Sequence, residues 1–263
     1  MRTTSNPAFR KLPEMAGGYA NFNYGQGQQS SYGQAPAAPP QAARPMTIDD
    51  VVTKTAITLV LAVITATLTF LAGPPAVILA LPAALVALVI SLVIVFTKKV
   101  RPALVVAYSA LEGVFLGGIS YLFASQFNLG MIMQAIVGTL GVFAAMLVVY
   151  KTGAIRVTPK LTKWIIGAVA GAAVLMLVNL VASFFMPGGL GLREGGMLGI
   201  GFSLLCIGIA AFSFLLDFDA ADKAIRSGVD AKFAWYIAFG LMTTLVWLYL
   251  EILRLLSYFS SSD

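Results

Sequence analysis

Long apolar runs separated by short polar breaks dominate the chain from residue 51 onward. The runs cover residues 51–72, 76–96, 103–124, 131–150, 164–185, 197–216 and 235–259. Each is long enough to cross the hydrocarbon core of a bilayer, which takes roughly 20 residues as an α-helix. Proline and glycine, which end helices, mark the breaks. The pattern therefore predicts seven transmembrane helices.

Composition agrees with this interpretation. The chain of 263 residues is 59% hydrophobic and only 11% charged, whereas about a quarter of the residues of a soluble domain are charged. The runs also lack the alternation of a β-barrel, and backbone hydrogen bonding in lipid then leaves only the helix. We expect an all-α membrane protein, a seven-transmembrane helical bundle.

The first 45 residues differ from the rest of the chain. They mix Gly, Gln, Ser, Ala, Tyr and Pro with few branched apolar side chains, so they cannot bury enough surface to offset chain entropy. We interpret residues 1–45 as a disordered, low-complexity tail and residues 46–263 as the membrane domain. Thr47, followed by Asp49 and Asp50, suits the N-terminal cap of the first helix.

Positive charge is distributed on one side of the predicted bundle. All but two of the 17 Lys and Arg residues fall in the tail, at the start of the first helix or in loops on the side of the N-terminus; the exceptions are Arg193 and Arg254. Loops rich in Lys and Arg stay in the cytoplasm. We expect a cytoplasmic N-terminus, a C-terminus outside, and a multi-pass protein of the plasma membrane. The net charge of +6 then reflects orientation and lipid attraction, and no nucleic-acid partner is expected.

The chain contains no histidine and a single cysteine, Cys206. Intramembrane hydrolases that use His-bound metal or a Ser-His pair are thereby excluded, and we expect no enzyme and no resident cofactor. An internal disulfide is impossible. Any pH response must come from carboxylates.

Four carboxylates lie within or at the ends of the predicted spans, where an ionisable side chain is costly and usually functional. Glu112 lies ten residues after Pro102 and Glu251 nine before Ser260, or about 15 and 13 Å at the helical rise, so both are near mid-bilayer. Asp217 and Asp219 come 20 and 22 residues after the sixth span begins at Met197, so we expect them at its cytoplasmic mouth.

These acids suit a cation path. Oxygen ligands bind hard cations such as Ca²⁺, so Asp217, Asp219 and Glu251 are candidate calcium ligands, with Glu112 on the same path. Two carboxylates held close together must share a proton, which makes passage sensitive to pH. Two structural alternatives are open: Arg254, three residues after Glu251, would neutralise it within one helix, and Asp217 and Asp219 would be solvated near Lys223.

Glycines recur in the spans and allow close approach of helices. Among them are Gly113 and Gly117 in the third run, Gly141 in the fourth and the Gly167-x-x-x-Gly171 motif in the fifth. We expect these glycines to pack inside the bundle, with a dimer contact as the alternative for the motif.

Several of these residues carry a resemblance. Glu112-Gly113 followed by Leu116-Gly117, Asp217 at the end of Phe-Leu-Leu-Asp, and Leu-Tyr-Leu-Glu251-Ile-Leu-Arg-Leu-Leu in the seventh run make the chain similar to the Bax inhibitor-one (transmembrane Bax inhibitor motif) family, and its tail resembles those of actinobacterial members. The resemblance covers about residues 47–259. It implies a pH-responsive calcium leak channel whose proton sensor is an aspartate pair from the sixth and seventh helices.

The sixth-helix aspartate of that pair matches Asp217 best, with Asp219 as a rival. Two alignments of the seventh helix are open. One matches Glu251 to the second aspartate but needs an insertion of about ten residues. The alignment without a gap places Thr244 there, which breaks the pair and leaves Glu251 about two turns further along.

We therefore expect a calcium or cation leak through the plasma membrane of a bacterium, with membrane lipids and cations as partners and a monomer or homo-oligomer as the assembly. The alternative is a non-conducting scaffold that regulates membrane stress responses through protein partners. Flux in pure liposomes separates the two.

Overall fold

The computed structural model describes residues 44–97 and 100–260. Within them the chain forms seven long helices, each long and apolar enough to cross a membrane. They are α1 (Ile48–Ala72), α2 (Pro74–Thr97), α3 (Pro102–Gln126), α4 (Leu129–Thr152), α5 (Pro159–Ser183), α6 (Met197–Arg226) and α7 (Ala234–Ser260), with a short 3-10 helix η2 (Ala231–Phe233) before α7. The predicted seven-helix membrane bundle is confirmed.

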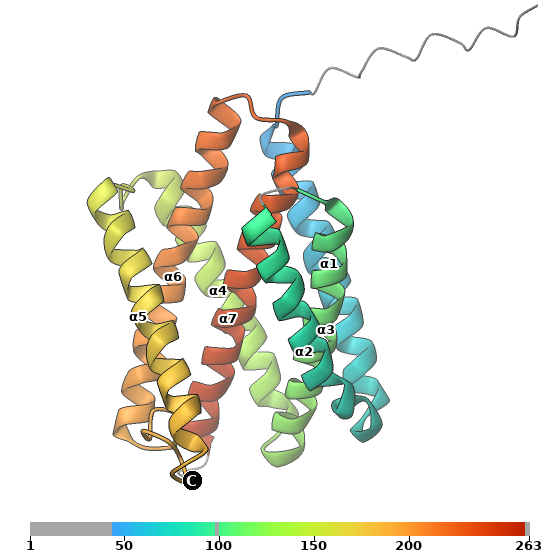
Figure 1. Ribbon diagram of the computed structural model, residues 1–263, viewed down its shortest axis with the longest axis vertical. Coiled ribbons are helices and arrows are strands. Elements are labelled where there is room, and N and C mark those ends of the chain that lie inside the picture. The colour runs from blue at the N-terminus through green and yellow to red at the C-terminus, as the bar shows by residue number, and fades with distance from the viewer. Residues whose placement is uncertain (1–43, 98–99, 261–263) are drawn as a thin grey trace, which may run out of the picture. The chain divides into compact units, whose positions relative to one another are not determined.

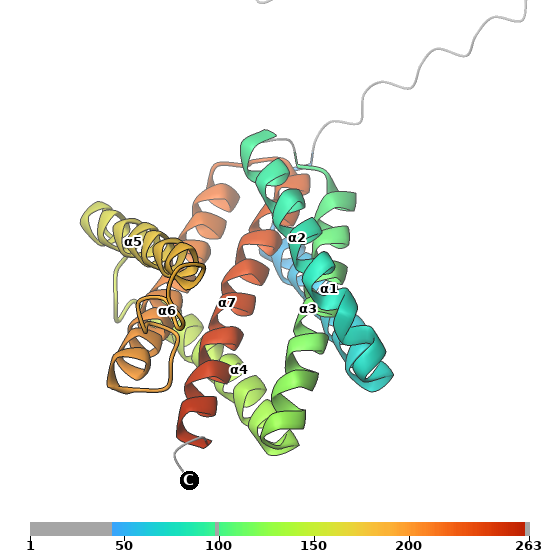
Figure 2. The ribbon, with the colours of Figure 1, turned by 60° about the horizontal axis from the view of Figure 1, so that its bottom comes forward.

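Successive helices run in opposite directions, and α7 stands in the middle of the bundle (Figures 1 and 2). In its most apolar stretch 67% of the residues are buried, against 17% in α1, α4 and α5. Helices α1, α2 and α3 pack together on one side of α7, α4 and α6 contact it on the other, and α5 packs mainly on α6. The helix with the most interior residues is thus the one that carries Thr244 and Glu251.

The helix ends follow from local chemistry. Thr47 accepts a hydrogen bond from the backbone N–H of Asp50 and Asp50 from that of Thr47, which is a reciprocal capping box. Thr158 caps α5, and Pro159 fills its first position, where the missing N–H is not needed. The expected start at residue 164 is therefore five residues late, because the cap and the proline precede the apolar run.

The predicted end of the sixth helix is also wrong. The apolar run ends at Leu216, but the helix continues to Arg226. The additional turns are stabilised by pairs between residues four apart, Asp219 with Lys223 and Asp222 with Arg226. Asp217 and Asp219 therefore lie within a helix and not in a loop.

The glycines of the spans fall into two groups, those in close contact with another helix and those with open space beside them. A Cβ on Gly113 or Gly117 of α3 would run into the carbonyl oxygens of Ala62 and Ala66 on α1, so the two backbones touch there. Gly141, Gly167 and Gly171 have nothing within 4 Å of such a Cβ. The expectation that this second group packs inside the bundle is wrong, because α4 and α5 are peripheral and turn these positions outward.

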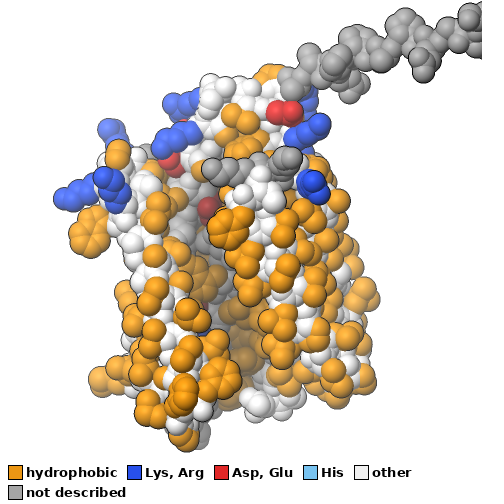
Figure 3. Space-filling view, in the orientation of Figure 1, with side chains coloured by type: hydrophobic (Ala, Val, Ile, Leu, Met, Phe, Trp, Pro, Cys, Tyr) orange, Lys and Arg blue, Asp and Glu red, His pale blue; other side chains and the backbone are white. Residues whose placement is uncertain are grey.

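Basic side chains gather at the end of the bundle where α1 begins, which we call the basic end (Figure 3). The described Lys and Arg residues of this end are Arg44, Lys54, Arg101, Lys151, Arg156, Lys160, Lys163, Lys223, Arg226 and Lys232. Arg193 is in the α5–α6 loop at the other end, and Arg254 is in α7. The one-sided distribution that the sequence indicates is thus present in the described residues, while Lys98 and Lys99 lie outside them.

The segment before α1 is attached to the α6–α7 connection. Pro45 forms an isolated β-bridge with Asp230, and the N–H of Met46 donates to the carbonyl of Val229 at 2.8 Å. The Met46 side chain is buried among residues of α6 and α7. The predicted disordered tail otherwise falls on residues 1–43, which lie outside the described residues.

Candidate functional site

Asp217 of α6 lies directly against α7. The hydroxyl of Thr244 donates a hydrogen bond of 2.8 Å to Oδ2 of Asp217, and the other carboxylate oxygen lies 3.6 Å from where a Cβ of Gly240 would be. Thr244 is buried and Asp217 half-buried. Gly240 is one turn before Thr244, so both lie on the same face of α7. The Asp217 carboxylate contacts this face, and the missing side chain of Gly240 leaves room for it.

A second carboxylate approaches the same stretch of α7 from α3. The hydroxyls of Tyr108 and Thr243 are 3.0 Å apart, and the half-buried Glu112, one turn after Tyr108, interacts with the Tyr108 hydroxyl. Thr243 is exposed although α7 is the most buried helix. The segment 240–244 of α7 is therefore flanked by Asp217 on one side and by Tyr108 and Glu112 on the other.

The bundle is open along α7. Figure 3 shows this face hollowed between α5 and α2, with an acidic side chain visible in its upper part. Segment 240–244 starts six residues into α7, about 9 Å from the beginning of that helix. Asp217 lies nine residues before the end of α6, about 13 Å from it by the same rise. Asp217 and segment 240–244 therefore lie at a similar depth, in the half of the bundle next to the basic end.

Glu251 has a different environment. The residue is 1% exposed, and its carboxylate forms an ion pair of 3.2 Å with Arg193 of the α5–α6 loop. Arg254, one turn away on α7, is 3.8 Å from the same Oε1. The pairing with Arg254, which the sequence left open as an alternative, is present, but the shorter ion pair is with Arg193. A buried charge without a partner is costly. The ion pair with Arg193 reduces this cost for Glu251 and joins the α5–α6 loop to α7.

Asp219 lies beside the basic end. It forms an ion pair with Lys223, whose side chain is 70% exposed. Asp222 forms an ion pair of 2.9 Å with Arg226, one turn further along α6. This is the structural alternative that the sequence left open for Asp219, an acid next to a solvated lysine. For Asp217, by contrast, the described partner is Thr244.

The candidate calcium ligands do not form one cluster. Asp217 contacts Thr244, Asp219 contacts Lys223 and Glu251 contacts Arg193. Among residues 44–97 and 100–260, no group of three or more carboxylate or thiol side chains could hold a metal ion. A cation that used these acids would therefore meet them one after another.

Three participants were not found from the sequence. Arg193 appeared only as the minority charge of the outer loops, and nothing in a linear pattern indicates that a loop arginine reaches a glutamate 58 residues later. Tyr108 and Thr243 lie within apolar runs, and hydropathy alone does not distinguish them from their neighbours. For Tyr108 one signal is available, because it lies four residues before Glu112 and therefore on the same helical face.

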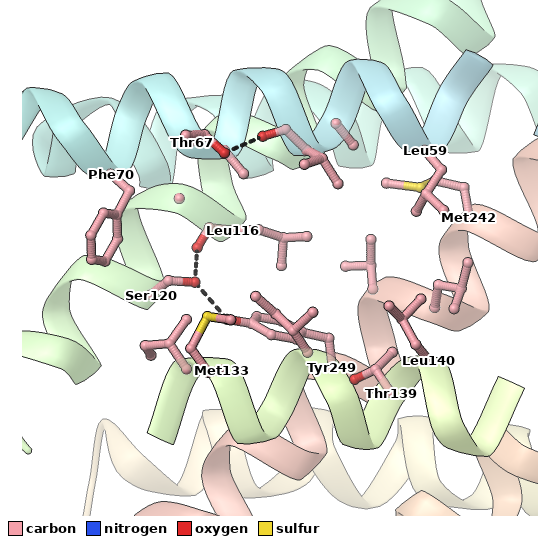
Figure 4. A pocket seen from close by; sticks show the side chains of 18 of the residues that line it. Leu59, Thr67, Phe70, Leu116, Ser120, Met133, Thr139, Leu140, Met242 and Tyr249 are labelled. Atoms are coloured by element: carbon pink, nitrogen blue, oxygen red, sulfur yellow. Dashed lines mark hydrogen bonds between the residues drawn. The ribbon is translucent and has the colours of Figure 1, made fainter. Parts of the chain in front are cut away.

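The bundle also contains a large cavity that none of these acids lines. It has a volume of about 380 Å³ and opens between α1 and α4 over a floor of α3 and α7. Its length is marked by Leu59 and Phe70 on α1, Leu129 and Leu140 on α4, and Met242 and Tyr249 on α7 (Figure 4). We call it the α1–α4 groove. None of the four acids considered above lines it.

Comparison with known families agrees with this architecture. A family model described as Bax inhibitor 1 like matches residues 6–261, nearly the whole chain. No match was found among curated proteins. The seven-helix bundle and the family match together identify a multi-pass membrane protein, and the chain belongs to the Bax inhibitor 1 like family.

Proposed function

We propose that this protein is a pH-responsive leak for calcium or similar cations in the plasma membrane of a bacterium, with no enzymatic activity. The observation that carries the proposal is the pair of half-buried carboxylates, Asp217 and Glu112, on either side of residues 240–244 of α7. An ionisable group inside a membrane span is expensive and is usually retained for a pathway or a proton relay. Membership of the Bax inhibitor 1 like family supports the same direction.

In this proposal Asp217 is the proton-sensitive group. When ionised, it attracts a cation that enters from the basic end, because an unscreened charge acts strongly in a low-dielectric interior. When protonated, it loses that attraction, so the leak decreases as the pH falls. Thr244 orients the carboxylate through its 2.8 Å hydrogen bond, and Glu112 supplies a second oxygen site across α7.

Orientation is part of the proposal. The basic end would face the cytoplasm, since loops rich in Lys and Arg stay on that side of the membrane. Asp217 then responds to cytoplasmic pH, because it lies in the half of the bundle next to that end.

A second candidate is a non-conducting scaffold. It is favoured by Glu251, which pairs with Arg193 and Arg254, and by the α1–α4 groove, whose lining includes none of the four acids. In the scaffold the buried charges specify how the helices assemble. Calcium flux through pure liposomes tests the choice. The leak predicts flux above that of protein-free vesicles, reduced in Glu112→Gln, whereas the scaffold predicts none.

A further inference from the structure

The α1–α4 groove lies within the membrane-spanning part of the fold. Its rims are α1 and α4, which are not among the closely packed helix pairs, and large aliphatic side chains on them are open to the surroundings, such as Val63 at 56% and Ile136 at 40% exposed. The floor is buried at Met242 and Tyr249 of α7, and Ile132 at the base of the α4 rim is buried beside them. Figure 4 shows the side chains of both rims projecting toward the open space. What surrounds such an opening is hydrocarbon.

Water is a poor occupant of this space. The Ser120 hydroxyl donates to the carbonyl of Leu116 at 2.6 Å and lies 2.7 Å from the Tyr249 hydroxyl. The hydroxyls of Thr139 and Thr67 donate to backbone carbonyls of their own helices. A buried water needs two to four polar partners, and apolar cavities stay dry. The hydroxyls that line the groove are thus already engaged by the protein.

The dimensions fit a hydrocarbon chain. From Leu59 to Phe70 on α1, and from Leu140 to Leu129 on the antiparallel α4, the groove follows eleven residues of helix, or about 16 Å. This is about half of the roughly 30 Å hydrocarbon core, which is the depth of one leaflet. Leu129 and Phe70 lie near the ends of their helices, at the surface opposite the basic end. The groove therefore runs along the bilayer normal, from one surface to the middle.

We propose that the α1–α4 groove holds one acyl chain of a phospholipid from the leaflet opposite the basic end. The chain enters sideways between α1 and α4 and lies against Ile132, Met242 and Tyr249. Interiors are close-packed and leave few voids larger than a water molecule, so an opening of about 380 Å³ is filled by what the surroundings supply. The inference is independent of cation flux and goes beyond it, because neither Asp217 nor Glu112 lines the groove.

Photocrosslinking tests the proposal on the full chain. The protein is reconstituted in liposomes that contain phosphatidylcholine with a diazirine midway along one acyl chain, and the labelled residues are mapped by mass spectrometry. The proposal predicts adducts on the groove floor, at Met242 or Tyr249, or on the adjoining Ile132, which ordinary lipid outside the bundle does not reach. Labelling confined to outward residues of all helices overturns the proposal. In the same liposomes, disulfide formation between two protein chains that carry Ile136→Cys would assign the groove to a second copy and overturn the proposal as well.

Two neighbouring residues of α4 provide a matched pair of variants. Ile136 lines the groove, whereas Val137 is 66% exposed and does not. Ile136→Trp fills the opening and should reduce floor labelling severalfold, while Val137→Trp adds the same bulk on the lipid side and should leave it unchanged. Equal labelling in both variants contradicts the proposal. If Ile136→Trp does not fold, Val246→Phe fills the groove from α7 and carries the same expectation.

Discussion

The hydroxyl of Thr244 donates a 2.8 Å hydrogen bond to the carboxylate of Asp217, and so joins α7 to α6 within the membrane. The alignment without a gap puts this threonine where the family resemblance implies the second sensor aspartate. Glu251, the other candidate, is two turns further along α7 and pairs with Arg193. In the proposed leak a single carboxylate, Asp217, therefore senses pH, and the Thr244 hydroxyl supports it.

A second carboxylate can be restored at this position. In Thr244→Asp the new side chain meets Asp217, and two adjacent carboxylates share a proton and titrate as a coupled pair. We expect calcium flux in liposomes to depend on pH more steeply and to rise further at high pH than in the wild type. Thr244→Asn, which is polar but neutral, is the matched control and should show no steeper dependence. Identical pH profiles for the two variants would count against Asp217 and residue 244 acting together.

The loop arginine Arg193 is predicted to stabilise the bundle through Glu251. Arg193→Gln leaves the buried Glu251 with Arg254, at 3.8 Å, as its remaining described cation. Breaking a buried pair typically costs about 3–5 kcal/mol, and we expect the lower end because Arg254 retains part of the attraction. Thermal unfolding in detergent measures the loss.

The double variant Arg193→Gln with Glu251→Gln is the control for this prediction. It removes the stranded charge, so it should recover most of the stability that Arg193→Gln loses. If the double variant is as unstable as the single one, the loop is held by something other than this ion pair.

Close contact between α1 and α3 makes Gly117 sensitive to substitution. A Cβ there would lie 2.9 Å from Cα of Ala66 and meet the carbonyl of the same residue, so the backbones would have to separate. Gly117→Ala should destabilise the protein by about 1–3 kcal/mol, as overpacking does. Gly141→Ala adds the same methyl group on α4 where nothing lies within 4 Å, and its unfolding temperature should equal or exceed that of the wild type. A loss of equal size in both variants would indicate a cause other than packing.

Labelling of engineered cysteines tests the orientation. Cys206 is buried, so the wild type should react little with a membrane-impermeant maleimide. Ser227, at the basic end, and Ser183, at the other end, are both exposed. In intact cells Ser183→Cys should be labelled and Ser227→Cys should be labelled only after permeabilisation. The opposite pattern would reverse the proposed orientation and place Asp217 near the outer surface.

Sequence patterns were sufficient for the architecture because the bilayer imposes length and hydrophobicity on each span. They were weaker at helix ends, where the pairs of Asp219 and Asp222 extend α6 past its apolar run. They also located the acids but not their partners. The contacts of Asp217 with Thr244 and of Glu251 with Arg193 join different helices or a loop, and such distances depend on how the bundle packs and not on spacing along the chain.

The central claim is that Asp217 makes a cation leak respond to pH, and calcium flux in liposomes tests it most directly. Flux is recorded from about pH 6 to about pH 8, across which a buried carboxyl can titrate, for the wild type, Asp217→Asn and Asp222→Asn. Asp222 is the control because it pairs with Arg226 at the exposed end of α6. We predict that flux rises with pH in the wild type and in Asp222→Asn, and is low and independent of pH in Asp217→Asn. An unchanged pH response in Asp217→Asn, or no flux in the wild type, would contradict the account.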